Sequence, residues 1–401
     1  MVDMAVTEPV LLLRYADVGA AIYASLRVVG QPQSTLTWVV DHHALAGGDE
    51  LLTAALPDPA PGEQLSEAIE RALSTGAFAS PAAEQRLAEL LGQQLLCPAA
   101  WQLVDEYSAS CGATLFITPT ARLARVPWTL LATPSGERLI ERIDVLMAAP
   151  PSIANSPRRP ACWEALGGRA PLVVLDPRVP GQRPDSALGS VLGRPDAGGS
   201  LARHFTELMG RREVLPEADA AVELFRRTDA DRGWLAAHLA RRPSRLLFVG
   251  HASAAEGDAG QAALHLAEAH PLSAADLMAA RLSMPPRVAL LACSSGGDYR
   301  FDEATGLVAA FLLGGAVLVT ATLWSLPTTN GYRRFCGRLD DSADPMAEAV
   351  IAVDTAHQAD DAGRALSVWQ REQLSRWCAG DLNASPLYWA ALATFTVDGA
   401  R

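Results

Sequence analysis

The stretches Arg245-Leu-Leu-Phe-Val-Gly-His251 and Arg287-Val-Ala-Leu-Leu-Ala-Cys293 decide the fold class of this chain. Both are short, continuous apolar runs with Pro, Gly or Ser at their ends, a pattern typical of strands that are buried on both faces of a parallel sheet. The segment Ser273–Arg281 between them has a helical pattern, with Ser273 as the predicted N-cap and Asp276 three residues later. The two runs and this helix therefore have the strand, helix, strand order of an α/β protein.

The same rhythm continues on both sides of these runs. We expect strands at 171–175 and 317–323, helices at 201–209, 218–225, 233–240 and 305–313, and a closing segment at 389–397. Further helices near 345–357 and 365–377 would cover the faces of the sheet. The predicted fold class is α/β, a doubly wound and mostly parallel sheet with helices on both faces.

The N-terminal part of the chain has a different pattern. Alternating runs at 10–15, 21–29 and 36–40 predict a small antiparallel meander. Helical patterns follow at 64–73 and 82–107, the second as one helix or two, and the segment 114–151 alternates strands with turn residues. The segment 157–168 is rich in Pro, Arg and Gly, which predicts a linker. We therefore divide the chain into a β-rich and helical accessory region, 1–80, and two parts of a main domain, 81–155 and 169–399.

The two runs that decide the fold also carry the candidate catalytic residues. In parallel sheets, ligands bind beyond the carboxyl ends of the strands, so His251 and Cys293 are predicted to face one crevice. A thiol attacks only as the thiolate, and an imidazole can take up its proton near neutral pH. The backbone N–H groups of Ala252 and Cys293 would lie where an oxyanion develops. Taken singly, Cys293 also fits a buried strand-end thiol and His251 a structural histidine, but their matched positions favour the pair.

Composition excludes several classes of function. The net charge is -12 and no run of basic residues occurs, which argues against a nucleic-acid partner. The six cysteines have no Cys-x-x-Cys spacing, so we expect neither zinc nor a disulfide framework, no cofactor, and a reducing cytoplasm. The acidic N-terminus is unlike a secretory signal. The uncharged stretch 304–324 has the length of a membrane span, but Gly314-Gly315 divides it into a predicted buried helix and strand.

Other candidate sites have weaker support. Asp41-His42-His43 contains metal-binding residue types, but adjacent side chains on a strand point to opposite faces, so we predict no metal there. His265 and His270 lie in the crossover and are predicted to be surface residues. Gly296-Gly297 is too short a glycine loop to indicate phosphate binding.

An ordered set of motifs resembles a CHAT domain, a family similar to caspases and separases within one clan of cysteine peptidases. The motifs are Ile117-Thr-Pro119, Val126-Pro-Trp128, Leu139-Ile-Glu141, Leu246-Leu-Phe-Val-Gly-His251, Val288-Ala-Leu-Leu-Ala-Cys293-Ser-Ser-Gly296, the stretch 306–324 and Pro386-Leu-Tyr-Trp-Ala-Ala391. The resemblance covers about residues 85 to 399. It implies a caspase-like fold with 81–155 as the pseudo-catalytic half and 169–399 as the catalytic half. It also implies hydrolysis of a peptide bond by a His-Cys dyad, His251 and Cys293.

The resemblance also implies a substrate-binding strand that ends at Trp324 and Ser325. An extended peptide would pair with this strand, and Trp324 would form the wall of a side-chain pocket, unless it is a core tryptophan. Two features depart from the family pattern. Ala252 replaces the usual Gly, and its Cβ would crowd the oxyanion site or strain the backbone. Acidic residues are missing just after the Trp motif, and Asp298, Asp302 and Glu303 would supply that charge, unless they are solvated surface carboxylates.

The function predicted from these observations is a cytoplasmic cysteine endopeptidase. The resemblance implies a protein or peptide substrate encoded nearby, for example in bacterial defence, and activation by a separate sensor or by the region before residue 85. Two alternatives stay open. One is a non-catalytic interaction module that keeps the fold and holds a peptide, which Ala252 favours. The other is acyl or peptidyl transfer in a biosynthetic pathway.

Overall fold

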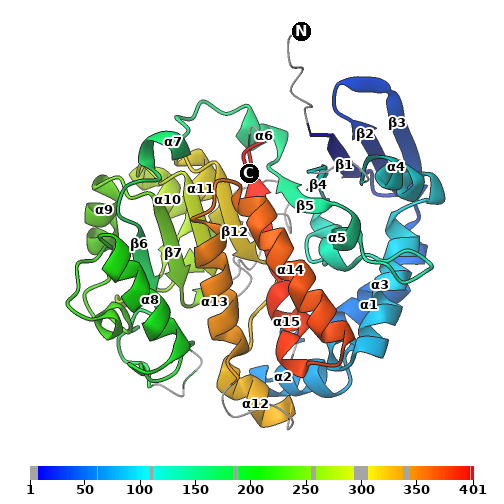
Figure 1. The fold of residues 1–401 in the computed structure, drawn as a ribbon. Coiled ribbons are helices and arrows are strands. Elements are labelled where there is room, and N and C mark those ends of the chain that lie inside the picture. Colours follow the sequence, from blue (N-terminus) through cyan, green and yellow to red (C-terminus); the bar gives the residue numbers. More distant parts are fainter. Residues whose placement is uncertain are drawn as a thin grey trace.

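A computed structural model describes residues 8–60, 62–108, 112–183, 186, 188–253, 259–292, 306–336, 343–397 and 399–401. Within these ranges a 10-stranded sheet runs through the molecule in the order β3-β2-β1-β4-β5-β13-β12-β11-β7-β6, and a 3-stranded sheet has the order β10-β9-β8 (Figure 1). The strands are β1 (Val10–Asp17), β2 (Ile22–Val28), β3 (Gln31–Val40), β4 (Thr114–Thr118), β5 (Asp144–Ala148), β6 (Leu172–Leu175), β7 (Arg245–Val249), β8 (Ala252–Ser253), β9 (Ala263–Leu264), β10 (Leu272–Ser273), β11 (Arg287–Leu291), β12 (Leu318–Thr322) and β13 (Leu392–Thr396).

The helices separate into long ones that cover the sheet and short ones in connections. They are α1 (His42–Ala55), α2 (Leu65–Ser74), α3 (Pro81–Leu95), α4 (Pro98–Ser108), α5 (Leu139–Arg142), α6 (Pro151–Ala154), α7 (Trp163–Leu166), α8 (Ser200–Arg211), α9 (Arg232–Ala240), α10 (Ala274–Ala280), α11 (Leu307–Leu313), α12 (Thr329–Cys336), α13 (Pro345–Ala356), α14 (Ala362–Cys378) and α15 (Pro386–Trp389). Single 3₁₀ turns lie at Ala77–Ala79, Ala121–Leu123, Trp128–Leu130, Ala221–Leu224, Ala259–Gln261 and Leu382–Ala384.

The central strands confirm the predicted parallel sheet. β6, β7, β11 and β12 run parallel to one another, and every residue in them is buried, as the continuous apolar runs require. β13 then pairs antiparallel with β12 and parallel with β5, so it joins the two halves of the sheet. The predicted crossover helix is also confirmed, because the Ser273 side chain accepts a hydrogen bond from the Asp276 N–H and caps α10.

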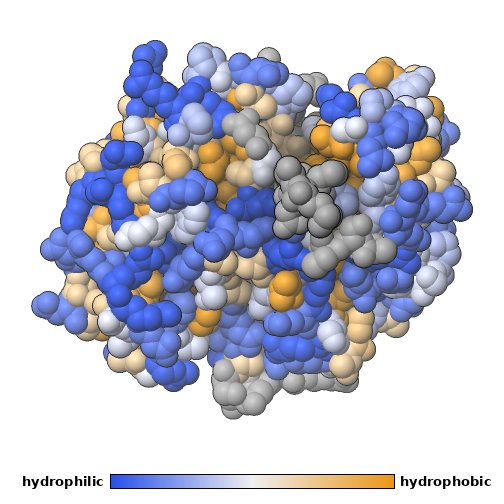
Figure 2. Space-filling model, turned by 45° about the horizontal axis from the view of Figure 1, so that its top comes forward, coloured by the Kyte–Doolittle hydropathy of each residue, from blue (hydrophilic) through white to orange (hydrophobic). Residues whose placement is uncertain are grey.

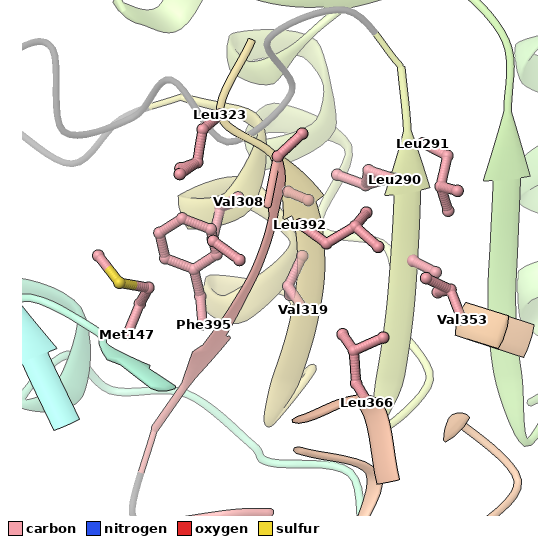
Figure 3. Close-up of a cluster of buried hydrophobic side chains, with 14 of the residues drawn as sticks. Met147, Leu290, Leu291, Val308, Val319, Leu323, Val353, Leu366, Leu392 and Phe395 are labelled. Atoms are coloured by element: carbon pink, nitrogen blue, oxygen red, sulfur yellow. The ribbon is translucent and has the colours of Figure 1, made fainter. Parts of the chain in front are cut away.

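Helices lie on both faces of the sheet, as expected for this fold class. α8, α13 and α14 cover the face that is nearer the viewer in Figure 1, and α10 and α11 cover the other. Figure 3 shows how this layer arrangement builds the core, with Val353 and Leu366 from helices of one face and Val308 from α11 packed against Val319 and Phe395 of the sheet. Burying one such side chain stabilises the fold by about 1.5–3 kcal/mol.

The N-terminal meander belongs to the same sheet. β1 pairs antiparallel with β2, and β2 with β3, as predicted from the alternating runs. β1 also pairs parallel with β4, with Leu11 opposite Leu115. The division of the chain at residues 80 and 155–169 stays a prediction, but strands from all of its parts hydrogen-bond into one sheet.

Several local features add to or correct the predictions. Residues 42–55 form a helix that the sequence analysis did not predict, and the Asp41 side chain caps it by accepting a hydrogen bond from the His43 N–H. The predicted helix at 218–225 shrinks to one 3₁₀ turn, since the Arg226 N–H bonds to the Leu175 carbonyl and draws the chain onto β6. The pattern at 82–107, for which one helix or two were predicted, forms two helices, α3 and α4, with Pro98 at the start of the second.

The uncharged stretch 304–324 folds as predicted in its described part. α11 ends before Gly314, Gly315 has a φ of +117°, and β12 follows. A φ in this range is open to glycine and strained for other residues, so the glycine pair permits the sharp change of direction. Among the described residues, no helix has both the length and the apolar character that crossing a membrane requires.

Candidate active site

The candidate base, His251, follows β7 after Gly250. β7 and β11 are adjacent and parallel, with Val249 opposite Leu291, and the Gly250 N–H donates to the Leu291 carbonyl at 3.2 Å. The two backbones therefore stay paired to their carboxyl ends. Ala292, the last described residue of this segment, is buried and directly precedes Cys293 in the sequence.

Cys293, Asp298, Asp302 and Glu303 lie outside the described residues. Their assignment as nucleophile, oxyanion donor and substrate-binding charges stays a prediction from the sequence.

The His251 ring is half-buried, and its Nε2 atom lies 3.3 Å from the Gly189 carbonyl oxygen. A carbonyl oxygen only accepts hydrogen bonds, so Nε2 carries the proton and Nδ1 keeps a lone pair that can accept one. Burial lowers the pKa of His251 below its ordinary value of 6.5, against smaller opposing effects of the Gly189 hydrogen bond and the Asp176 charge. The ring is therefore neutral at pH 7, as a general base must be.

A buried network holds the acceptor of the His251 hydrogen bond in place. Arg226 Nη1 donates to the Gly189 carbonyl at 2.7 Å and to Asp176 Oδ1 at 3.2 Å. Asp176 directly follows β6, is fully buried, and accepts a hydrogen bond from the Ser190 hydroxyl at 2.6 Å. Burial raises the pKa of Asp176, while Ser190 and Arg226 oppose that effect. Arg226 thus holds the Gly189 carbonyl, and Asp176 holds the adjacent Ser190.

Two residues of this network have strained backbones. Asp176 and Arg226 have φ values of +51° and +52°, in the left-handed region where residues other than glycine are disfavoured by about 1–2 kcal/mol. Such strain persists only where the surrounding contacts over-determine the geometry, and it clusters at functional sites. The sequence analysis missed both residues. The available signal was the position of Asp176 directly after an apolar strand, the same signal that singled out His251.

Ala252 lies in β8 opposite Leu264 of β9, and the His265 N–H donates to the His251 carbonyl at 3.0 Å. In an antiparallel pair with this pattern, the N–H of Ala252 points away from β9. Ala252 does not have a positive φ, so the backbone strain considered above is absent. His265, predicted to be a surface residue, is half-buried, and its Nε2 lies 2.5 Å from the Ser253 hydroxyl.

The strand end at Trp324 and Ser325 contacts the accessory region. Trp324 is fully buried, stacks on Phe78 with ring centroids 5.9 Å apart, and donates its indole N–H to the Leu387 carbonyl at 3.1 Å. The Ser325 N–H donates to Asp58 Oδ1 at 3.1 Å. The structure therefore gives Trp324 the contacts of a core residue. It also brings an acidic side chain, Asp58, to the position just after the Trp motif, where the sequence itself has none.

The model of the CHAT domain family matches residues 85–400. This chain belongs to the CHAT family. Two solved structures of the Saccharomyces cerevisiae separase–securin complex also resemble it, one at 3.0 Å and one at 2.6 Å resolution. The first has 9% identity and a TM-score of 0.47, and covers 97% of this chain but 30% of the separase chain. The second has 10% identity and a TM-score of 0.42, with the same coverage. A search of the curated proteins found no match.

Within this CHAT chain, the Asp41-His42-His43 segment makes structural contacts. Asp41 caps α1, and His42 Nε2 lies 3.3 Å from Asp17 Oδ1. The premise that these residues lie on a strand was wrong. The described residues contain no group of three or more His, Cys, Asp or Glu side chains arranged to hold a metal ion.

Proposed function

We propose that this CHAT domain is a cysteine endopeptidase in which His251 activates Cys293. The observation that carries the proposal is the hydrogen bond from His251 Nε2 to the Gly189 carbonyl, because it leaves Nδ1 as the ring atom able to take a proton. The parallel register of β7 and β11, which holds to Gly250 and Leu291, supports a common location for the residues that follow them.

In this mechanism, Nδ1 of His251 removes the proton of the Cys293 thiol, and the thiolate attacks the scissile carbonyl carbon. The backbone N–H groups of Ala252 and Cys293 donate to the oxyanion that forms. The imidazolium then returns its proton to the leaving amine as the C–N bond breaks, which leaves an acyl-enzyme. Water, deprotonated by His251, hydrolyses the thioester and regenerates the thiol.

The substrate would lie along the chain segment that follows β12. An extended peptide pairs with backbone groups near Trp324 and Ser325 other than the Ser325 N–H, which donates to Asp58, in the manner of an added strand. Asp298 and Glu303 contribute charge from the loop after Cys293. Asp58 adds a carboxylate at Ser325, although Arg125 pairs with it and offsets its charge. The substrate we propose is a segment of a partner protein, cut in the cytoplasm under control of a separate sensor or activator, as in bacterial defence.

Labelling with a peptidyl acyloxymethyl ketone tests the proposal, because this electrophile reacts with activated thiols in peptide-binding clefts. Wild type should be labelled at Cys293, and labelling should disappear in Cys293→Ala and His251→Ala. Cys378→Ala is the matched control, since Cys378 is a surface thiol whose pKa is raised by partial desolvation. Equal labelling of Cys378 and Cys293, or labelling that survives His251→Ala, would favour the non-catalytic module.

A second measurement separates hydrolysis from transfer. New N-termini are identified in a cell extract after addition of wild type or Cys293→Ala. Hydrolysis yields free N-termini and free carboxylates that depend on Cys293. If added amines are instead captured on the new carboxyl ends, the reaction is acyl or peptidyl transfer.

A further inference from the structure

A groove of about 990 Å³ lies at the end of the sheet opposite to the end that carries His251. Pro243 precedes β7 and Pro285 precedes β11, so the groove is at the amino ends of these strands. Figure 2 turns this side toward the viewer and shows hydrophobic residues exposed between hydrophilic ones. The walls come from the 157–161 segment, α7, α10 and α11.

The lining of the groove consists mainly of apolar residues and arginines, and it contains no acidic residue. Met278, Leu282 and Leu313 are partly exposed apolar lining residues, and Leu277 and Met284 are buried beneath them. The charged lining residues are all arginines, namely Arg158, Arg159, Arg242 and Arg281. In a chain with 45 acidic and 33 basic residues, a groove with this lining has a positive potential unlike that of the molecule as a whole.

Three of these guanidinium groups are free to bind a ligand. Within the described ranges, the side chains of Arg159, Arg242 and Arg281 are exposed and make no hydrogen bond or ion pair. A second hollow of about 260 Å³ shares Arg242 and Pro243 with the groove and adds Arg169, Arg212 and Arg241. Its acidic lining residue, Glu213, pairs with Arg241 at 3.1 Å. Arg241 also pairs with Glu217, so Arg169 and Arg212 are the arginines that extend the basic surface beyond the groove.

The backbone gives an independent reason to assign a role to two of these side chains. Arg242 and Arg281 have φ values of +54° and +49°, where glycine is the favoured residue. Each follows a helix, α9 or α10, at a position where a glycine would end the helix with less strain. Two strained arginines that both line one groove are the pattern expected where a side chain is kept for binding.

We propose that this groove binds an acidic, amphipathic segment of a partner protein. The apolar side chains of the segment lie against Met278 and Leu313, and its carboxylates pair with Arg242 and Arg281. A membrane surface fits less well, because a concave apolar surface does not insert into a bilayer. A nucleic acid also fits less well, since the groove has no aromatic lining residue on which bases could stack. Because the groove is remote from the catalytic edge, a bound partner leaves that edge open.

The test selects peptides from a displayed library of random sequences on the full chain and measures their binding by fluorescence anisotropy. Enriched peptides should have net negative charge together with several large apolar residues. Their affinity should fall about tenfold in the double variant Arg242→Gly with Arg281→Gly, which removes two exposed ion pairs. Glycine relieves the positive φ at both positions, so this variant should unfold at the same temperature as wild type or a higher one.

Two controls make the result decisive. Arg86→Ala removes an exposed arginine on α3, far from the groove lining, and should leave peptide binding unchanged. Met278→Gln makes the apolar surface polar and should weaken binding without changing the charge. The proposal is overturned if no acidic peptide is enriched, or if enriched peptides bind the double variant as tightly as wild type. Cosedimentation with phosphatidylglycerol vesicles, lost in the double variant and without peptide binding, would assign the groove to membranes instead. Every readout here is binding, so failure of the proposed peptidase activity would not affect it.

Discussion

Asp354→Asn removes one charge of a buried ion pair that anchors the amino end of β7. Arg245, the first residue of β7, donates from Nε and Nη2 to Asp354 Oδ1 at 3.1 and 2.8 Å. His204 Nε2 and Gln358 Nε2 each lie 2.9 Å from Oδ2 of the same carboxylate. The Arg245 and Asp354 side chains are 1% and 0% exposed, so water cannot replace a lost partner.

The expected loss of stability arises because Asp354→Asn leaves the Arg245 charge buried without its partner. Removing one partner of a buried ion pair costs about 3–5 kcal/mol, because the other charge stays buried without compensation. Arg245 Nη1 already lacks a hydrogen-bond partner among the described residues, so no other side chain neutralises the guanidinium. A loss of this size is a large part of the about 5–15 kcal/mol by which a domain is usually stable.

Denaturant unfolding monitored by circular dichroism measures the change in the free energy of unfolding. Arg376→Ala is the matched control. Arg376 is 38% exposed and pairs with Glu348 and Asp381, so its loss should cost less than about 1 kcal/mol. Arg245→Met combined with Asp354→Leu should recover most of the loss, because no isolated charge remains. The reasoning is refuted if Asp354→Asn costs no more than the control, or if the double variant is as unstable as the sum of the single ones.

The same pair predicts the pH dependence of stability. Burial alone would raise the pKa of Asp354, but Arg245 and His204 outweigh it and hold the pKa below 3.8. The unfolded state therefore binds a proton first as the pH falls. The stabilisation is fully present above about pH 4, the pKa of an unfolded aspartate, and is lost below it as the pH falls through the folded pKa. The difference between wild type and Asp354→Asn should shrink over that range.

Three further predictions concern the site and the packing around it. Because the pKa of His251 is lowered, the acid limb of the pH–rate profile for peptide hydrolysis should have its midpoint below 6.5, and a midpoint above that value would contradict the assigned environment. Arg226→Met removes a positive charge that lowers the pKa of His251, and it leaves the Asp176 charge that raises it. The acid limb should therefore move to higher pH. An unchanged profile would show that the Arg226 guanidinium has no electrostatic effect on His251. Gly92→Ala places a Cβ 2.0 Å from a backbone oxygen and should cost about 1–3 kcal/mol in denaturant unfolding. Gly47→Ala, which meets nothing within 4 Å, should be neutral or stabilising, and equal costs at both positions would argue against the packing of α3.

The sequence by itself determined the strands of the central sheet and the end of that sheet at which His251 lies. The runs that end before His251 and Cys293 are apolar after their first residue, an arginine, and such runs are typical of strands covered on both faces. The capping of α10 by Ser273 and the break at Gly314-Gly315 were also local, since each depends on backbone preferences of adjacent residues.

The tertiary structure decided which distant groups meet at that edge. The Gly189 carbonyl, Arg226 and Asp176 come together around His251, and Asp58 reaches Ser325 across 267 residues of sequence. The local sequence pattern predicts whether a residue is buried and where the backbone turns. It does not report which segment lies opposite, because in a sheet of this topology the neighbours of a strand come from far along the chain.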